Sequence, residues 1–138
     1  MMLKGDKMNT SNLRIMLVED DEFTRSTLRS ALENQGLDIV HDAGTVKGGL
    51  EAAKSLRPDV AVLDYNLGKG PNGIDLANQL RKFQPSIGIV LLTAFLNPAE
   101  LDSKISQLPP GSRYLVKHSV NKIEVLVKEI SEAAKYKG

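Results

Sequence analysis

The stretch DVAVLDYNL, residues 59–67, places the carboxylate of Asp64 directly after a short apolar run. No polar residue interrupts the letters VAVL, which is typical of a strand buried on both faces of a parallel sheet. Four further apolar runs occur along the chain: LRIMLV (13–18), LDIV (37–40), IGIVLL (87–92) and RYLV (113–116). The sequence therefore predicts five strands, with the quoted run near the centre of the sheet.

Segments with helical spacing of their apolar residues follow each of these runs. Gly36 is placed to end the first helix, Thr45 is a candidate N-cap for the second, and Pro58 must stop the second. The fourth helix has Asn97 as its predicted cap and Pro98 at its first helical position. Five alternations of strand and helix predict an α/β fold, a doubly wound parallel sheet with helices on both faces.

Length and composition are those of one ordinary globular domain. The chain has 138 residues, of which 41% are hydrophobic and 25% charged, and its formal net charge is +1. This charge provides no general field for nucleic acid or anionic lipid, and the absence of cysteine excludes disulfides and thiolate chemistry. No apolar stretch is long enough to span a bilayer. We expect a flexible polar leader over residues 1–12, one domain over residues 13–138, and a cytoplasmic location.

Polar side chains come directly after four of the five predicted strands. They are Glu19, Asp20 and Asp21 after the first, Asp64 after the third, Thr93 after the fourth and Lys117 after the fifth. Taken singly, a strand-ending aspartate is more often a turn residue or a helix cap, and a lysine there is more often solvated. The carboxyl ends of parallel strands meet at one edge, where doubly wound folds place their functional crevice. Together these residues predict one shared site, with an imported cation to neutralise the clustered acids.

The motifs at these strand ends resemble those of the receiver domain of two-component response regulators. The resemblance covers residues 13–136 and rests on Glu19-Asp20, DVAVLDYNL around Asp64, VLLTAF around Thr93 and YLVK ending at Lys117. It implies a flavodoxin-like (CheY-like) fold with five strands in the order 2-1-3-4-5. It also implies that Asp64 accepts a phosphoryl group from a sensor histidine kinase or a histidine phosphotransfer protein.

The same resemblance implies a Mg²⁺ site among the acids. Asp20 and Asp64 would bind the ion directly together with the backbone carbonyl of Asn66, and Glu19 would act through water. Oxygen donors of this kind suit Mg²⁺, which keeps several of its own waters.

The resemblance also implies that three further residues turn phosphorylation into a signal. Lys117 would pair with the phosphoryl oxygens as a compact charge, and Thr93 would donate its hydroxyl to them. Tyr114 occupies the family's switch position, although a half-buried strand aromatic is an equally good description of it. The output surface would be the fourth helix, fifth strand and fifth helix, roughly residues 97–136, which is also a possible homodimer surface. No direct contact with nucleic acid or membrane is expected of this domain.

Three positions depart from the family pattern or leave a choice open. Asp21 is expected to cap the following helix, and the alternative is that Asp20 and Asp21 form the metal-binding pair. His118 stands where the family usually has a proline after a cis bond. A cis bond before a non-proline residue costs about 3–4 kcal/mol, so the Lys117–His118 bond is predicted to be trans. Gly73 lies nine residues after the phospho-acceptor position, slightly beyond the commoner spacing, which predicts a remodelled loop.

Two rival function classes stay open. A phosphohydrolase that forms an aspartyl phosphate would carry a second acid two residues after its nucleophile, where this chain has Asn66. A receiver-like interaction module that never takes phosphate would be supported by loss of Asp20, Asp64 or Lys117, and all three are present. The glycine-rich stretches at 44–49 and 67–73 match no nucleotide-binding motif, and two isolated histidines do not indicate a zinc site. The predicted function is a signalling switch with at most slow self-dephosphorylation, rather than an enzyme.

Overall fold

The computed structural model describes residues 12–94, 97–117 and 122–138, in which strands and helices alternate five times. The strands are β1 (Arg14–Val18), β2 (Asp38–Ala43), β3 (Val60–Asp64), β4 (Gly88–Thr93) and β5 (Arg113–Val116). The helices are α1 (Glu22–Asn34), α2 (Val46–Leu56), α3 (Gly73–Phe83), α4 (Pro98–Ile105) and α5 (Ile123–Ala133). All neighbouring strands are parallel and the sheet order is β2-β1-β3-β4-β5, so the predicted fold and strand order are confirmed. Within the described residues, no helix combines the length and the apolar character needed to cross a bilayer.

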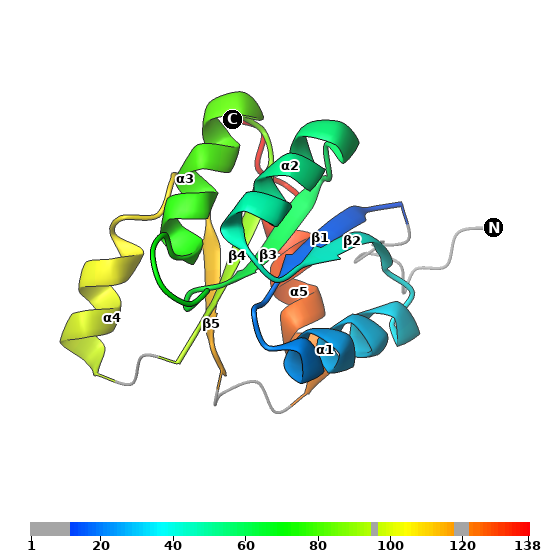
Figure 1. The fold of residues 1–138 in the computed structure, drawn as a ribbon, viewed down its shortest axis with the longest axis horizontal. Helices are drawn as coiled ribbons and strands as arrows, with labels where there is room; N and C mark the ends of the chain where they lie inside the picture. The colour runs from blue at the N-terminus through cyan, green and yellow to red at the C-terminus, as the bar shows by residue number, and fades with distance from the viewer. Residues whose placement is uncertain (1–11, 95–96, 118–121) are drawn as a thin grey trace.

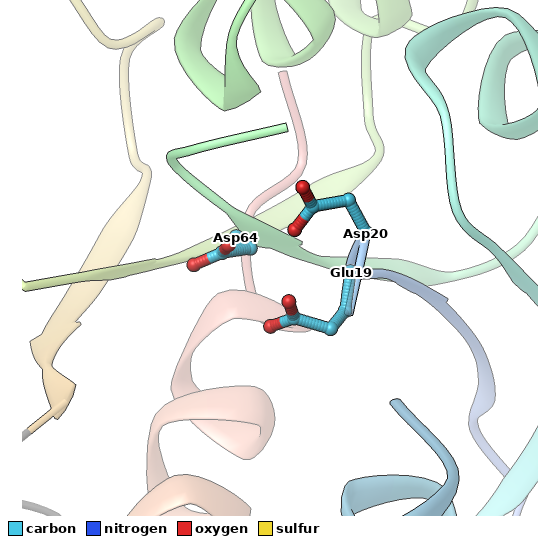
Figure 2. Close-up of side chains that lie close together, drawn as sticks. All are labelled: Glu19, Asp20 and Asp64. Carbon is cyan, nitrogen blue, oxygen red and sulfur yellow. The ribbon is translucent and has the colours of Figure 1, made fainter. Parts of the chain in front are cut away.

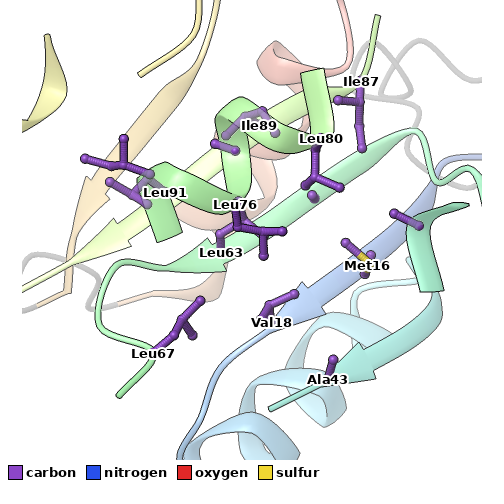
Figure 3. Close-up of a cluster of buried hydrophobic side chains, with 14 residues drawn as sticks. Met16, Val18, Ala43, Leu63, Leu67, Leu76, Leu80, Ile87, Ile89 and Leu91 are labelled. Carbon is purple, nitrogen blue, oxygen red and sulfur yellow. The ribbon is translucent and has the colours of Figure 1, made fainter. Parts of the chain in front are cut away.

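Helices cover both faces of the sheet (Figure 1). On one face α2 and α3 pack over a core that includes Met16, Leu63 and Leu80, shown in Figure 3. On the other face α1 and α5 pack over a second core, which includes Leu17 and Ile130. Every position of β3 and β4 is buried, as their uninterrupted apolar runs predict. The central strands are therefore packed on both faces, which fixes the position of their carboxyl ends.

Side-chain caps fix where the helices next to the strand ends begin. Asp21 is the N-cap of α1, and its carboxylate accepts hydrogen bonds from the backbone N–H of Thr24 at 2.8 Å and from the Thr24 hydroxyl at 2.6 Å. Asn72 caps α3 in a capping box with Asp75. Asn97 caps α4 immediately before a proline at the first turn. The predicted capping roles of Asp21 and Asn97 are confirmed.

Several strands end later than their apolar runs predicted. β2 continues to Ala43, beyond the predicted end at residue 40, because it stays paired with β1 as far as Val18. Asp64 and Thr93 are the last residues of β3 and β4 rather than the first residues after them. Ladder pairing with the next strand extends through both positions. Residues 1–11 of the predicted leader, and His118 of the bond predicted to be trans, lie outside the described residues, so both expectations stay predictions.

Gly73 begins α3 directly against the backbone of β3. A Cβ atom at this position would clash with the carbonyl oxygen of Asp64, and would lie 3.0 Å from the Asp64 carbonyl carbon and from Leu91 Cδ1. The N–H of Gly73 donates to the carbonyl oxygen of Tyr65 at 2.8 Å. The loop between β3 and α3 thus returns so closely that only a residue without a side chain fits.

We expect Gly73→Ala to lower the free energy of unfolding by about 1–3 kcal/mol, because the added methyl group must displace the Asp64 backbone or the packed Leu91. Urea unfolding followed by circular dichroism measures the change. Lys82→Ala, at an exposed position of the same helix, is the control and should stay within about 0.5 kcal/mol of the parent. A Gly73→Ala protein as stable as the parent would contradict the close packing.

Candidate functional site

The ends of β1, β3, β4 and β5 border a cavity of about 420 Å³ at the carboxyl edge of the sheet. Its lining residues are Glu19, Asp20, Asp21, Thr24, Asp64, Tyr65, Asn66, Thr93, Ala94 and Lys117. The structure thus brings together all the site residues named from the sequence except Tyr114, which is not among the lining residues. The roles of these residues stay predictions.

Three carboxylates form a cluster in this cavity. Glu19 and Asp20 extend from the end of β1, and Asp64 extends from β3 next to it (Figure 2). One oxygen atom from each lies within 4.8 Å of the others. Glu19 and Asp64 are buried, with 2% and 4% of their surface exposed, whereas Asp20 is exposed. Hard oxygen donors at this spacing fit a divalent ion such as Mg²⁺, with Asp20 on the solvent side.

The side chain of Lys117 reaches this cluster from the end of β5, which lies on the opposite side of β3 and β4 from β1. Its Nζ atom lies 2.8 Å from Asp64 Oδ1 and 3.4 Å from Glu19 Oε1. The Glu19 carboxylate also accepts a hydrogen bond from the backbone N–H of Asp21 at 3.1 Å. One ammonium group therefore contacts the two buried acids of the cluster, while the third, Asp20, has no ion pair with it.

Burial raises the pKa of both buried acids. For Asp64 the loss of hydration is the largest influence, the contacts with Lys117 oppose it, and the charge of Asp20 adds to it. For Glu19 the loss of hydration is again the largest influence, and the hydrogen bond from Asp21 opposes it. Burial acts to lower the pKa of Lys117, but the contacts with Asp64 and Glu19 outweigh burial and raise this pKa. The acids are thus not fully compensated by their lysine, which favours binding of a further cation.

Thr93, Asn66 and Tyr114 differ in their relation to the cavity. Thr93 is 1% exposed and lines it at the end of β4. Asn66 lines it two residues after Asp64, and its side-chain oxygen accepts a hydrogen bond from the N–H of Gly68 at 3.2 Å. Tyr114 lies on β5 with 41% of its surface exposed. Thr93 is therefore already inside the site, whereas Tyr114 lies at the surface and could reach the interior only by moving inward.

Tyr65 is a lining residue that the sequence analysis did not single out. Its backbone N–H donates to the carbonyl oxygen of Leu92 at 2.8 Å, which continues the pairing of β3 and β4 past Asp64. Its hydroxyl accepts a hydrogen bond from the Asn72 side chain at 3.4 Å. The only sequence signal for Tyr65 is its place directly after Asp64, which does not reveal where the side chain lies.

Comparison with known proteins identifies the family. The family described as the response regulator receiver domain matches residues 15–130. This chain belongs to that family. Receiver domains act in two-component signal transduction, where response regulators interact with histidine kinases, and they generally bind Mg²⁺ at an acidic pocket. The cluster of Glu19, Asp20 and Asp64 supplies such a pocket here.

Individual relatives agree with the family match. The DNA-binding transcriptional activator DevR/DosR of Mycobacterium tuberculosis is 35% identical over 106 residues, which cover 76% of this chain and 48% of the relative. The nitrate/nitrite response regulator protein NarP of Escherichia coli is 32% identical over 123 residues, covering 88% of this chain and 55% of the relative. The chain spans about half or less of the length of these and similar curated relatives.

Solved structures show the same fold. The signal receiver domain of NarL from Mycobacterium tuberculosis superimposes with a TM-score of 0.74 at 25% identity, covering 89% of this chain and 96% of that one. A CheY-like receiver domain protein from Methanospirillum hungatei superimposes with a TM-score of 0.72 at 22% identity, covering 89% of this chain and 96% of that one.

We expect Asp64→Asn to raise the free energy of unfolding of the metal-free protein at neutral pH. Because the folded pKa of Asp64 is raised, its contribution to stability is present below the unfolded pKa and is lost as the pH rises through the folded pKa. An uncharged amide avoids that loss, so the gain should shrink as the pH falls below the unfolded pKa.

Urea unfolding at several pH values, with chelator present, measures this difference. Asp102→Asn, at an exposed position of α4, is the control and should change stability by no more than about 0.5 kcal/mol. If Asp64→Asn destabilised the protein at neutral pH, the attraction of Lys117 would outweigh burial, and the folded pKa of Asp64 would be lowered rather than raised.

Proposed function

We propose that this chain is a phosphorylation-dependent signalling switch in which Asp64 accepts a phosphoryl group from a sensor histidine kinase or a histidine phosphotransfer protein. The surroundings of Asp64 support this best. Its carboxylate lines the cavity, contacts the Lys117 ammonium at 2.8 Å, and lies within metal-sharing reach of Glu19 and Asp20. Among the three acids, only Asp64 is a strand-ending residue flanked on one side by the other acids and on the other by Lys117 and Thr93.

The acids would hold Mg²⁺ in this proposal. Asp20 and Asp64 are the proposed direct ligands, with the backbone carbonyl of Asn66 as a third, and Glu19 would act through water. Bound Mg²⁺ would neutralise negative charge and align the phosphoryl oxygens, which is most of what phosphoryl transfer requires. The exposure of Asp20 and the burial of Glu19 agree with this division, since the ion must keep several waters.

The proposed step is an attack by an oxygen of the Asp64 carboxylate on the phosphorus of a phosphohistidine. The new oxygen–phosphorus bond forms as the phosphorus–nitrogen bond breaks, and the electron pair of the broken bond leaves with the imidazole nitrogen, so an acyl phosphate remains on Asp64. Lys117 would exchange its contact with the carboxylate for one with the phosphoryl oxygens, and Thr93 would donate its hydroxyl to them. Positive groups on both flanks would thus stabilise the charge that develops during transfer. Slow hydrolysis of the acyl phosphate would reset the switch.

The proposed output surface consists of α4, β5 and α5. Tyr114 and Val125 are 41% and 39% exposed on this surface, and an ion pair of 2.6 Å between Arg113 and Glu129 joins β5 to α5. A phosphoryl group adds about two negative charges and strong acceptors. It would draw the Thr93 hydroxyl toward the phosphoryl oxygens and leave space for the Tyr114 ring to turn inward, which changes the surface offered to a partner or to a second copy of the chain.

We expect Asp20→Ala to weaken Mg²⁺ binding by about tenfold or more, because the substitution removes one of only a few direct ligands. Asp21→Ala should leave Mg²⁺ affinity nearly unchanged and lower the free energy of unfolding by about 1 kcal/mol, because the Asp21 carboxylate caps α1. Isothermal titration with MgCl₂ and urea unfolding measure the two effects. Greater loss of Mg²⁺ affinity in Asp21→Ala than in Asp20→Ala would make Asp20 and Asp21 the metal-binding pair instead.

Acetyl phosphate with Mg²⁺ should produce one base-labile phosphoryl adduct per chain, located on Asp64. Intact-protein mass spectrometry detects the adduct, and borohydride trapping followed by peptide mapping locates it. The adduct should be absent from Asp64→Asn, absent when Mg²⁺ is chelated, and present in Asp102→Asn.

Beryllofluoride with Mg²⁺ separates the rival function classes in the same preparation. A receiver should respond with amide shifts at Thr93 and along β5, whereas an interaction module that takes no phosphate should not respond. Rapid turnover of acetyl phosphate would instead indicate a phosphohydrolase. An adduct of equal yield in Asp64→Asn would refute the proposed acceptor and leave the fold and family unchanged.

A further inference from the structure

The guanidinium group of Arg25, on α1, links the acid cluster to β2. Its Nη1 atom donates to the backbone carbonyl oxygen of Glu19 at 2.8 Å, and its Nε atom donates to Asp42 Oδ1 at 3.0 Å. The side chains of Arg25 and Asp42 are only 21% and 24% exposed. A single planar group therefore joins three elements: the end of β1, the first turns of α1, and the end of β2.

The surroundings of Arg25 hold this guanidinium in one place. Asp42 also accepts a hydrogen bond from Arg29 Nη1, and Arg29 Nη2 donates to the carbonyl oxygen of Ile39 at 3.1 Å. Two residues after Asp42, Gly44 leaves the space that the guanidinium occupies, because a Cβ atom there would lie 2.8 Å from Arg25 Nη1. Asp42 thus orients the group and Gly44 provides room for it.

The contact with the Glu19 carbonyl acts on the peptide group that joins Glu19 to Asp20. The N–H of Glu19 donates to the Ala43 carbonyl oxygen at 3.0 Å, so the backbone of Glu19 is held by β2 at its nitrogen and by Arg25 at its oxygen. With both backbone groups fixed, the two successive carboxylates project toward Asp64 rather than apart (Figure 2). Like charges this close favour separation unless the backbone prevents it.

The direction in which the Arg25 guanidinium donates its hydrogen bonds also matters. The two donors described above point to a carbonyl oxygen and to Asp42, and not to the acids of the cavity. Lys117, by contrast, contacts two of those acids directly. Arg25 can therefore order the acid cluster without competing with a metal ion for its oxygens.

We propose that Arg25 is a positioning residue for the metal site: oriented by Asp42, it holds the Glu19–Asp20 peptide so that both carboxylates face Asp64. This inference rests on the proposed function, in which these acids bind Mg²⁺. Arginine suits the role because its guanidinium presents several donors in one rigid plane, whereas a lysine ammonium is a single point on a flexible stem. An ammonium at residue 25 can reach the Glu19 carbonyl or Asp42, but does not fix their relative orientation.

Arg29 provides a matched control within the same helix. It also binds Asp42 and ties α1 to β2, but its donors bind Glu33, Asp42 and Ile39 rather than Glu19. Loss of a partly exposed ion pair alone changes stability little. Arg29→Gln therefore reports the effect of removing a charged contact between α1 and β2. Arg25→Gln removes a contact of the same kind and, in addition, the contact with Glu19.

The test combines Mg²⁺ titration by calorimetry with amide hydrogen exchange on the parent, Arg25→Gln, Arg25→Lys and Arg29→Gln. Arg25→Gln should weaken Mg²⁺ binding by about tenfold, as losses of groups that orient metal ligands typically do. Arg25→Lys should recover part of that affinity, and Arg29→Gln, which keeps the contact between Arg25 and Glu19, should lose less affinity than Arg25→Gln. In metal-free protein, the amides of Glu19 and Asp21 should exchange faster in Arg25→Gln than in Arg29→Gln, while the amides of β3 exchange equally.

Equal Mg²⁺ affinity and equal exchange in Arg25→Gln and Arg29→Gln would overturn the inference, and so would acceleration of exchange throughout the sheet. Failure of the proposed function has a different signature, since the parent itself would then show no Mg²⁺ binding. In that case the exchange of Glu19 and Asp21 in metal-free protein still decides whether Arg25 holds their backbone. A readout that depends on no metal thus separates the two failures.

Discussion

A carboxylate that is buried beside other carboxylates is the constraint on which the rest of this structure depends. Asp64 is 4% exposed and Glu19 is 2% exposed, and the pKa of each is raised by the loss of hydration. Lys117, at 2.8 Å from Asp64, offsets part of this cost. The remaining negative charge makes the site ready for a divalent cation and, in the proposed function, for a phosphoryl group that arrives with one. In a fold that left these acids in bulk water, hydration would stabilise their charge, and no bound cation would be needed.

The parallel sheet provides the geometry that this constraint requires. Its strands run in one direction, so the residues that end β1, β3, β4 and β5 meet at one edge although they lie far apart in the chain. Two cores, one on each face, hold the central strands in place. The close return of the chain at Gly73 then leaves the backbone of Asp64 little freedom to move. The packed sheet thus holds the backbone of the acids in place, and the cavity at its carboxyl edge leaves space next to their carboxylates.

Two cationic side chains serve the acid cluster in different ways. Lys117 contacts the carboxylates, so its contacts must change if a phosphoryl group or a metal ion arrives. Arg25 contacts the backbone of Glu19 and the carboxylate of Asp42, so its contacts need not change. This division separates a group that takes part in the proposed switch from one that maintains the site. The role of Lys117 belongs to the proposed function, whereas the position of Arg25 follows from the packing of α1 against β2.

The amino-acid sequence was sufficient to predict the order of the elements, the strand order through resemblance, and the polar residues at the carboxyl ends of the strands, although not the last residue of β2, β3 or β4. Apolar runs, caps such as Asn97 and the acids after β1 are local signals, which depend on neighbouring residues and can be recognised in the sequence alone. The three-dimensional structure was needed to show which of three successive acids join the cluster with Asp64, because the carboxylate of Asp21 is engaged by its bonds to Thr24. The structure was also needed to show that Lys117 contacts Asp64 and Glu19, and that Arg25 reaches Glu19 with Asp42 as its support. These contacts join residues that are far apart in the sequence and are brought together by the packing of separate strands and helices. The periodicity of a sequence indicates which face of an element is buried, but not which distant side chain a given side chain contacts.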